Sequence, residues 1–205
     1  MEEHKRTGWD DIDAALEALY PNQKPLHYGT LIRYSLGGND PLDGISIYDA
    51  GNYYHFVTYG FSEIYEREND SDISGFGFEL TYKLKKNANI DENELKNFAG
   101  VLQTLARYIF NSKTVFKPHE YIATGQQEGM DSKKQSKIVG FVTIEDPQLK
   151  TINTVNGKLQ FVELIGATYS ELNKIMSKEK TSTEMIDEII ARFTDITDYS
   201  RESLY

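Results

Sequence analysis

The feature that most constrains the fold is a run of strict alternation near the middle of the chain. Every second position holds a large apolar side chain: Phe76, Phe78, Leu80, Tyr82 and Leu84. The positions between them are small or polar: Gly77, Glu79, Thr81, Lys83 and Lys85. A period of two is typical of a strand with one buried face. We therefore predict a strand whose apolar side rests on a core and whose polar side faces solvent.

An acidic turn comes directly before this strand. It follows Ile64-Tyr65 and carries four carboxylates: Glu66, Glu68, Asp70 and Asp72. A charged turn leading into a strand suits a recognition edge, although the same charges also keep a surface strand soluble. Residues 70–75 resemble the start of a calcium loop, but Glu79 comes two residues early for the bidentate ligand, and no helix is predicted on either side. We expect a solvated acidic turn.

Composition limits the classes of partner and location. The 205-residue chain has a formal net charge of −10, which repels nucleic acid and favours either a basic partner or simple solubility. No apolar run approaches the roughly 18 residues of a membrane span, and the N-terminus lacks the apolar core of a secretory signal. The absence of Cys excludes a disulfide framework and a thiolate metal site. We expect a cytoplasmic protein.

Local signals predict a mixture of strands and helices. Strands are predicted over 26–36, 45–49, 53–60, near 119–123, and over 137–144, 151–155, 158–164 and 194–205. Helices are predicted over 8–20, from Asp91 through Ile109, and after the capping residues Thr168 and Thr181. Strict βαβ alternation is absent, and no long linker divides the chain. We predict one α+β domain over residues 1–205, with a mixed or antiparallel sheet and helices packed on it.

Motifs for catalysis are scarce. The four histidines have no spacing typical of zinc ligands, and the chain lacks a nucleophile elbow and a thiol. Asp40 and Asp43 are a carboxylate pair that suits metal-assisted acid–base chemistry, but in a turn rich in Gly and Pro such side chains more often hydrogen-bond backbone amides. We therefore predict no catalytic residue, metal ligand or cofactor, and keep an acidic metal-dependent enzyme as the third hypothesis.

Several motifs in fixed order carry a resemblance to a known family. They are residues 36–43 (LGGNDPLD), 59–65 (YGFSEIY), 74–81 (SGFGFELT), 105–110 (LARYIF), 145–148 (EDPQ), 161–166 (FVELIG) and 196–198 (ITD). From about residue 9 to the end, the chain resembles Suppressor of fused domain proteins of the small bacterial single-domain kind. The combination of motifs is specific, whereas each motif alone is weak.

The resemblance implies protein binding without catalysis. Animal members clamp an extended peptide as an added strand, using this domain, a second C-terminal domain, and a Tyr and an Asp in the region that matches Tyr65 to Asp72. We expect no counterpart of the second domain and a shorter turn, so either Asp70 or Asp72 matches that Asp. Bacterial relatives resemble immunity proteins that neutralise a secreted toxin, often a nuclease.

These observations give two leading hypotheses. The first is a non-enzymatic immunity protein that blocks a basic toxin domain. The alternative is a regulatory scaffold that captures an extended peptide of a cellular protein by strand addition. In both cases we expect the partner to contact Tyr65, Glu66, Glu68, Asp70, Asp72 and Glu79.

Overall fold

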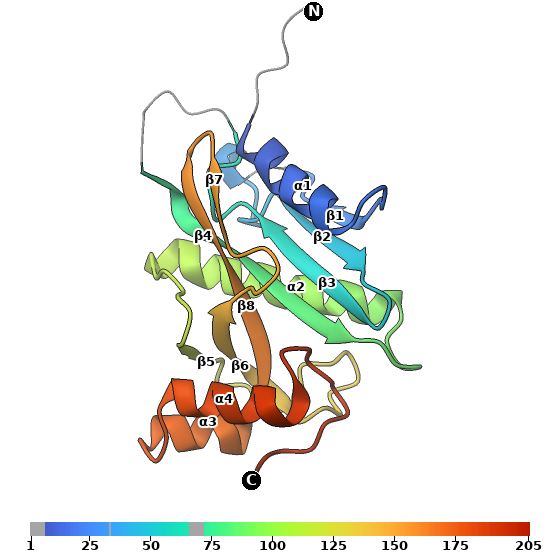
Figure 1. The fold of residues 1–205 in the computed structure, drawn as a ribbon, viewed down its shortest axis with the longest axis vertical. Helices are drawn as coiled ribbons and strands as arrows, with labels where there is room; N and C mark the ends of the chain where they lie inside the picture. Colours follow the sequence, from blue (N-terminus) through green and yellow to red (C-terminus); the bar gives the residue numbers. More distant parts are fainter. Residues whose placement is uncertain (1–6, 33, 66–71) are drawn as a thin grey trace, which may run out of the picture.

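The computed structural model describes residues 7–32, 34–65 and 72–205, and within them a mixed sheet of eight strands and four α-helices (Figure 1). The strands are β1 Leu26–Gly29, β2 Gly44–Asp49, β3 Tyr53–Tyr59, β4 Ile73–Lys85, β5 Tyr121–Ala123, β6 Ile138–Glu145, β7 Thr151–Thr154 and β8 Gly157–Thr168. The helices are α1 Gly8–Leu19, α2 Glu92–Ser112, α3 Tyr169–Met176 and α4 Ser182–Phe193. The predicted α+β class is confirmed. No helix among the described residues has the length and apolar character needed to cross a membrane.

The sheet has the order β1-β2-β3-β4-β8-β6-β5, with β7 paired to β8. Strands β1 to β4 are antiparallel neighbours, whereas β4 and β8 run parallel and make the sheet mixed. The long strand β8 pairs with β7 through its first residues and with β6 through its last ones. Strand β4 is therefore an interior strand, paired with β3 on one side and with β8 on the other.

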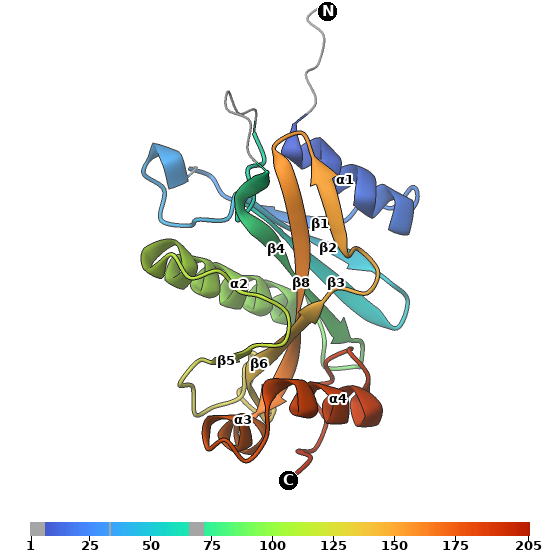
Figure 2. The same cartoon turned by 60° about the vertical axis from the view of Figure 1, so that its left-hand side comes forward.

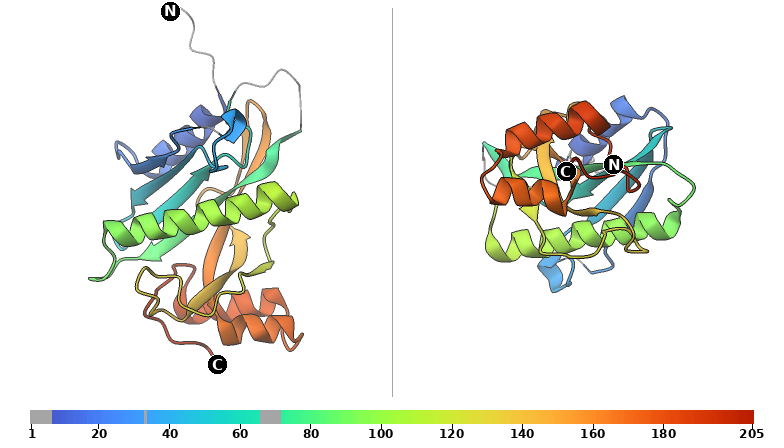
Figure 3. Two further views of the ribbon diagram at one scale, coloured as in Figure 1. Left: turned by 180° about the vertical axis from the view of Figure 1, so that it is seen from behind. Right: turned by 90° about the horizontal axis from the view of Figure 1, so that it is seen from below.

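Helices cover both faces of the sheet. Figure 2 shows α2 and α1 on opposite sides of it, and Figure 3 shows α2 crossing the face seen from behind, with α3 and α4 gathered at the end where β6 and β8 meet them. The apolar stripe of α2 packs on the same core cluster as Phe78, Leu80 and Tyr82 of β4. Helix α1 packs with Val57 and Phe161 on the opposite face. Both faces of the central strands are consequently removed from water.

This arrangement contradicts the prediction that β4 has one solvent face. Glu79 and Thr81 are completely buried and Lys83 is only 2% exposed. The polar face is buried because α1 and the segment after α4 cover it, and because its polar side chains find partners there. The alternating pattern predicted the strand and its apolar face correctly, but it gave no sign of the second cover.

Capping signals predicted the helices well. Thr7 and Asp10 form a reciprocal capping box at α1, Asp91 accepts a hydrogen bond from the Glu94 amide at α2, and Thr168 and Thr181 begin α3 and α4.

Two strand predictions are wrong. The strand predicted over 26–36 ends at Gly29, because its partner β2 begins opposite at Gly44, and a short 3-10 helix follows at Tyr34–Leu36. The strand predicted over 194–205 is reduced to one bridge between Thr197 and Leu84, and ion pairs hold that segment instead.

Candidate partner-binding surface

The structure fixes both ends of the acidic turn predicted to bind a partner. Glu66, Glu68 and Asp70 lie outside the described residues. Tyr65 is half-buried against the core beneath α1, and its carbonyl accepts a hydrogen bond of 2.6 Å from the Asn156 side chain. Asp72 is exposed, and its carbonyl accepts a bond of 2.9 Å from the Lys158 amide. The two ends of this segment are thus attached to the β7–β8 hairpin.

Glu79 lies inside the molecule and does not face solvent as the sequence suggested. One carboxylate oxygen accepts hydrogen bonds from the Gly60 amide and from the Ser62 amide and hydroxyl, at 2.7–2.9 Å, and the other accepts from Thr58 at 2.6 Å. Burial raises the pKa of Glu79 to about 7, although the hydrogen bonds from Thr58 and Ser62 lower it. Glu79 therefore orders the loop that leads to Tyr65, and its carboxylate has no exposed surface for a partner.

The most exposed apolar side chains lie on the loop that follows β1. Leu31 is fully exposed, Leu36 is 75% exposed and Ile32 is 60% exposed. Tyr34 makes an edge-to-face contact with Phe110 near the end of α2, at 5.2 Å between ring centres. We call Leu31, Ile32, Tyr34 and Leu36 the apolar loop. Soluble proteins rarely expose such a group of large apolar side chains unless a partner covers it.

The apolar loop adjoins the start of β4 and a polar rim. The ring of Phe76 lies 5.1 Å from Phe110, and the Lys113 ammonium lies over both rings at 5.6 and 5.8 Å. Arg107 pairs with Asp40 at 2.5 Å nearby. An apolar centre with a charged rim is typical of protein interfaces. Figure 2 shows the loop that follows β1 and the end of α2 on the left-hand side of the molecule, with the start of β4 next to them.

Sequence reasoning missed the apolar loop because it assigned these residues to a strand. The available signal was the dense turn that begins at Gly37, which leaves residues 31–36 without a partner strand.

Strand addition at β4 is excluded by its hydrogen bonding. Residues 78–82 of β4 pair with β8, and the Phe76 amide donates to the Phe61 carbonyl at 2.8 Å. Gly75, with φ of +57°, lets the backbone turn here, since a Cβ at this position would lie 2.6 Å from the Phe61 carbonyl oxygen. An added strand needs an unpaired edge, and among the described strands β1, β5 and β7 each have a single neighbour.

A chain of buried polar groups runs through the face of the sheet beneath α1. The Tyr20 hydroxyl contacts His55 Nδ1 at 2.8 Å, and His55 Nε2 contacts Asp146 at 3.1 Å. Thr81 donates to the same Asp146 oxygen at 2.8 Å. Burial alone would raise the pKa of Asp146, but the hydrogen bond and charge of His55, with the charge of Lys83, lower it well below its usual value. His55 and Asp146 are completely buried, so a substrate has no access to this chain of groups.

Lys83 is the charged centre of the same layer. Its ammonium lies 2.8 Å from Glu163 and 2.7 Å from Asp195, and it has 2% exposure. Asp195 belongs to the segment after α4, so this pair of contacts attaches that segment to the sheet.

Chemistry with a metal finds no support in the arrangement of acidic groups. Within the described parts of the chain, no three side chains of the metal-ligating types converge. Asp40 is paired with Arg107, and the Asp43 backbone bonds to Tyr59 and Thr30 at the sheet edge.

Fold and site together define a class: an α+β domain with helices on both faces of its sheet and an exposed apolar loop after β1. The sequence model of the Suppressor of fused protein (SUFU) matches residues 38–202. The chain therefore belongs to the Suppressor of fused family, which confirms the family suggested by the motifs.

Relatives agree in sequence and in structure. The human and mouse proteins called Suppressor of fused homolog are each 32% identical over 171 residues, covering 76% of this chain and 34% of theirs. The chain thus spans about a third of the length of these relatives. A crystal structure of a Sufu–Fu complex superposes with a TM-score of 0.82 at 28% identity, covering 97% of this chain and 92% of that one. The crystal structure of Drosophila Suppressor of Fused superposes with a TM-score of 0.83 at 27% identity, covering 98% of this chain and 52% of that one.

A homologue from Neisseria gonorrhoeae FA 1090 shares the fold at 12% identity. Its TM-score is 0.62, and the match covers 95% of each chain.

Proposed function

We propose that the chain is a protein-binding module, and that it is an immunity protein which neutralises a basic toxin domain such as a nuclease. The observation that carries this proposal is the exposed apolar loop after β1, which lies against Phe110 of α2 near Phe76 of β4. A related domain has been crystallised in a Sufu–Fu complex, which supports binding of a protein.

The two parts of this surface contribute differently to binding. Apolar side chains that become buried supply affinity, and the three most exposed ones here belong to one short loop. Charges supply speed and selectivity, because the net charge of −10 attracts a basic surface such as the one a nuclease uses to hold phosphate. Association should therefore slow as salt screens this attraction, whereas dissociation should depend mainly on the apolar loop.

We assign the chain no catalytic activity. The most chemically suggestive groups, His55 with Asp146 and Lys83 with Glu163, are buried and already paired with one another. A protein that acts by covering its partner has no need of a reactive group.

One observation favours the alternative of peptide capture. Strand β1 is a short edge strand, three of whose four residues are exposed, and it leads directly into the apolar loop. An extended peptide that paired with this edge would place side chains against the same apolar loop.

The test is a comparative pull-down from lysate of the source organism, read by mass spectrometry at low and high salt. The variant Leu31→Ser/Leu36→Ser changes exposed side chains and should fold normally. The matched control is Tyr169→Ser on α3, which is 58% exposed on a surface distant from the loop. We expect wild type and control to recover a basic protein at low salt and the loop variant to lose it. Equal recovery by all three would contradict the proposed surface.

A further inference from the structure

A groove of about 670 Å³ separates α1 from strands β1 and β2, on the face of the sheet that α1 covers. Its helix side carries Trp9, Asp13 and Glu17, which lie four residues apart along one side of α1. Its floor includes His27 and Ser46 of the two strands. Figure 1 shows α1 alongside these strands. The volume lies within the roughly 300–1,000 Å³ that is typical of ligand clefts.

Trp9 brings to the groove the aromatic ring that attracts cations most strongly. It is the only tryptophan of the chain and is half-buried. Its ring stacks on Tyr59, with 4.5 Å between ring centres, and lies 5.7 Å from the His27 ring. Elsewhere the fold places a cation over an exposed ring, as with Lys86 over Tyr54 at 4.4 Å. Among the described residues no lysine or arginine lies over Trp9, so this ring is suited to a cation from another molecule.

Asp13 places a carboxylate in the same groove. The Tyr59 hydroxyl donates to it at 2.8 Å, and the Trp9 indole also donates to it. Burial raises the pKa of Asp13, and the hydrogen bonds from Tyr59 and Trp9 offset only part of that rise. In the part of the chain that the structure describes, this carboxylate pairs with no lysine or arginine. His27 does not supply the positive charge, because burial lowers its pKa despite the charge of Asp13 and leaves the ring neutral at pH 7.

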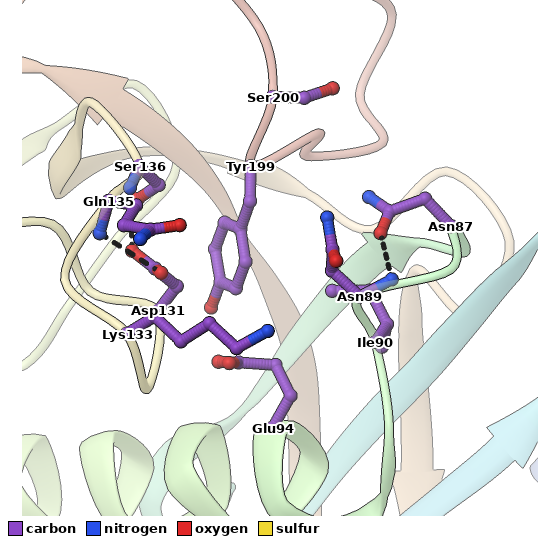
Figure 4. Close-up of a pocket in the computed structure, with 10 residues that line it drawn as sticks. All are labelled: Asn87, Asn89, Ile90, Glu94, Asp131, Lys133, Gln135, Ser136, Tyr199 and Ser200. Carbon is purple, nitrogen blue, oxygen red and sulfur yellow. Dashed lines mark hydrogen bonds between the residues drawn. The ribbon is translucent and has the colours of Figure 1, made fainter.

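A second cavity, of about 200 Å³ at the start of α2, shows how the fold itself satisfies a carboxylate (Figure 4). Asp131 accepts hydrogen bonds from the amides of Ser136 at 2.7 Å and Gln135 at 3.1 Å, both drawn in Figure 4. Burial alone would raise the pKa of Asp131, but these hydrogen bonds lower it. The pKa of Asp13 is shifted the other way, so of these two carboxylates Asp13 is the one that a cation would stabilise.

The charges that line the groove are mainly negative. Asp10, Asp13 and Glu17 contribute three carboxylates, against the one ammonium of Lys24. An anionic ligand would therefore be repelled, and a neutral ligand would leave the carboxylate of Asp13 without a cation. A guanidinium stacks on an aromatic ring and donates to a carboxylate from the same plane, whereas an ammonium is a compact, strongly hydrated point charge. The combination of ring and carboxylate thus favours arginine over lysine.

We propose that this groove binds an arginine side chain of a protein partner. The guanidinium stacks on Trp9 and donates to Asp13, with Glu17 as a further acceptor one turn along α1. This inference rests on the proposed function in requiring a basic partner, and it adds a contact separate from the apolar loop. Strand β1 leads from the groove to that loop, so a partner that used both surfaces would cross this strand.

The test is a titration of the full chain with the peptide acetyl-GRGRG-amide at low salt, followed by the fluorescence of Trp9. This signal reports on the groove alone, because the chain has no other tryptophan. We expect a saturable change with the arginine peptide and binding of acetyl-GKGKG-amide weaker by at least about threefold. The acidic peptide acetyl-GEGEG-amide should give no change. Absence of a saturable change with the arginine peptide would overturn the proposal, and equal binding of the lysine peptide would overturn the choice of arginine.

Variants separate a specific contact from attraction to the net charge. Asp13→Asn removes one charge and keeps an acceptor for Tyr59, and it should weaken binding of the arginine peptide about tenfold. The matched control Asp187→Asn removes one charge from an exposed position on α4 and should bind as wild type does. Equal affinity in these two variants would overturn the proposal.

Failure of this proposal and failure of the proposed function give different results. The pull-down with Leu31→Ser/Leu36→Ser changes the apolar loop and leaves the groove intact. A negative peptide titration with a positive pull-down would therefore remove only the groove, whereas a positive titration with equal recovery by all three proteins would remove only the apolar loop.

Discussion

Replacing Glu79 by Gln separates the effects of burial and of hydrogen bonding at a completely buried carboxylate of β4. Burial raises the pKa of Glu79 from its usual 4.5 to about 7, despite four hydrogen bonds to the charged form. Between those two pH values the unfolded chain releases its proton and the folded chain keeps it. The contribution of Glu79 to the free energy of unfolding is therefore fully present below pH 4.5 and is lost as the pH rises through about 7.

The magnitude follows from the size of the shift. At about 1.36 kcal/mol per unit, the rise from 4.5 to about 7 corresponds to a loss of roughly 3 kcal/mol across that range. Glu79→Gln has no such titration. The carbonyl oxygen of the Gln side chain can accept the hydrogen bonds from Gly60 and Ser62. Its amide group can donate to the Thr58 hydroxyl, because that hydroxyl can turn to donate to the Leu80 carbonyl, 3.3 Å away. The substitution itself should cost about 1 kcal/mol at low pH.

Urea unfolding of both proteins at a series of pH values from about 4.5 to 8 measures this difference, because all other groups titrate alike in the two proteins. Wild type should be the more stable at low pH and should lose about 3 kcal/mol relative to Glu79→Gln as the pH rises. A constant difference, or a relative gain by wild type, would show that the hydrogen bonds outweigh burial and that the reasoning is wrong.

Three further changes probe the core and the surface. Phe78→Ala removes a buried ring stacked on Phe61 at 4.9 Å and should cost about 3–5 kcal/mol in urea unfolding, whereas a near-neutral result would contradict its place in the core. Lys83→Met leaves Glu163 buried without its cation and should lower the free energy of unfolding by about 3–5 kcal/mol. The double variant Lys83→Met/Glu163→Gln should recover part of that stability. No recovery would argue against the broken ion pair as the cause. Changing the four carboxylates of the acidic turn to Ser should slow association with a basic partner at low salt in stopped-flow mixing and leave the melting temperature unchanged, and equal rates would remove the turn from the interface.

Signals between residues close in sequence predicted the helices, because the contacts that start a helix are also made between residues close in sequence. Helices began at Thr7, Asp91, Thr168 and Thr181 because a cap involves residues three positions apart. Strands depend on a distant partner, which explains the two failures. Among the described residues after β1, none up to Leu36 has a strand opposite it, and residues 194–205 meet β4 at a single bridge.

Burial of the polar face of β4 was invisible to the sequence for the same reason. Lys83 is satisfied by Glu163 and Asp195, which lie 80 and 112 positions further along the chain. Glu79 bonds to a loop that precedes it by about twenty residues. Alternation predicts which side chains share a face, but the fold as a whole decides whether that face meets water.

A role of Tyr65 and Asp72 in binding stays a prediction; the structure places them at the two ends of the acidic turn. The apolar loop was assigned to a strand by the sequence, although its side chains are among the most exposed large apolar ones described. An exposed apolar side chain and a buried one have the same letter in a sequence, so only the packed structure distinguishes them.

Neutralisation in living cells tests the central claim most directly. The basic protein recovered by the pull-down is expressed from an inducible promoter, alone or with wild type, Leu31→Ser/Leu36→Ser or Tyr169→Ser. We predict that the partner alone stops growth, that wild type and Tyr169→Ser restore it, and that the loop variant does not. Growth unaffected by the partner, or restored equally by the loop variant, would contradict an immunity protein that acts through the apolar loop.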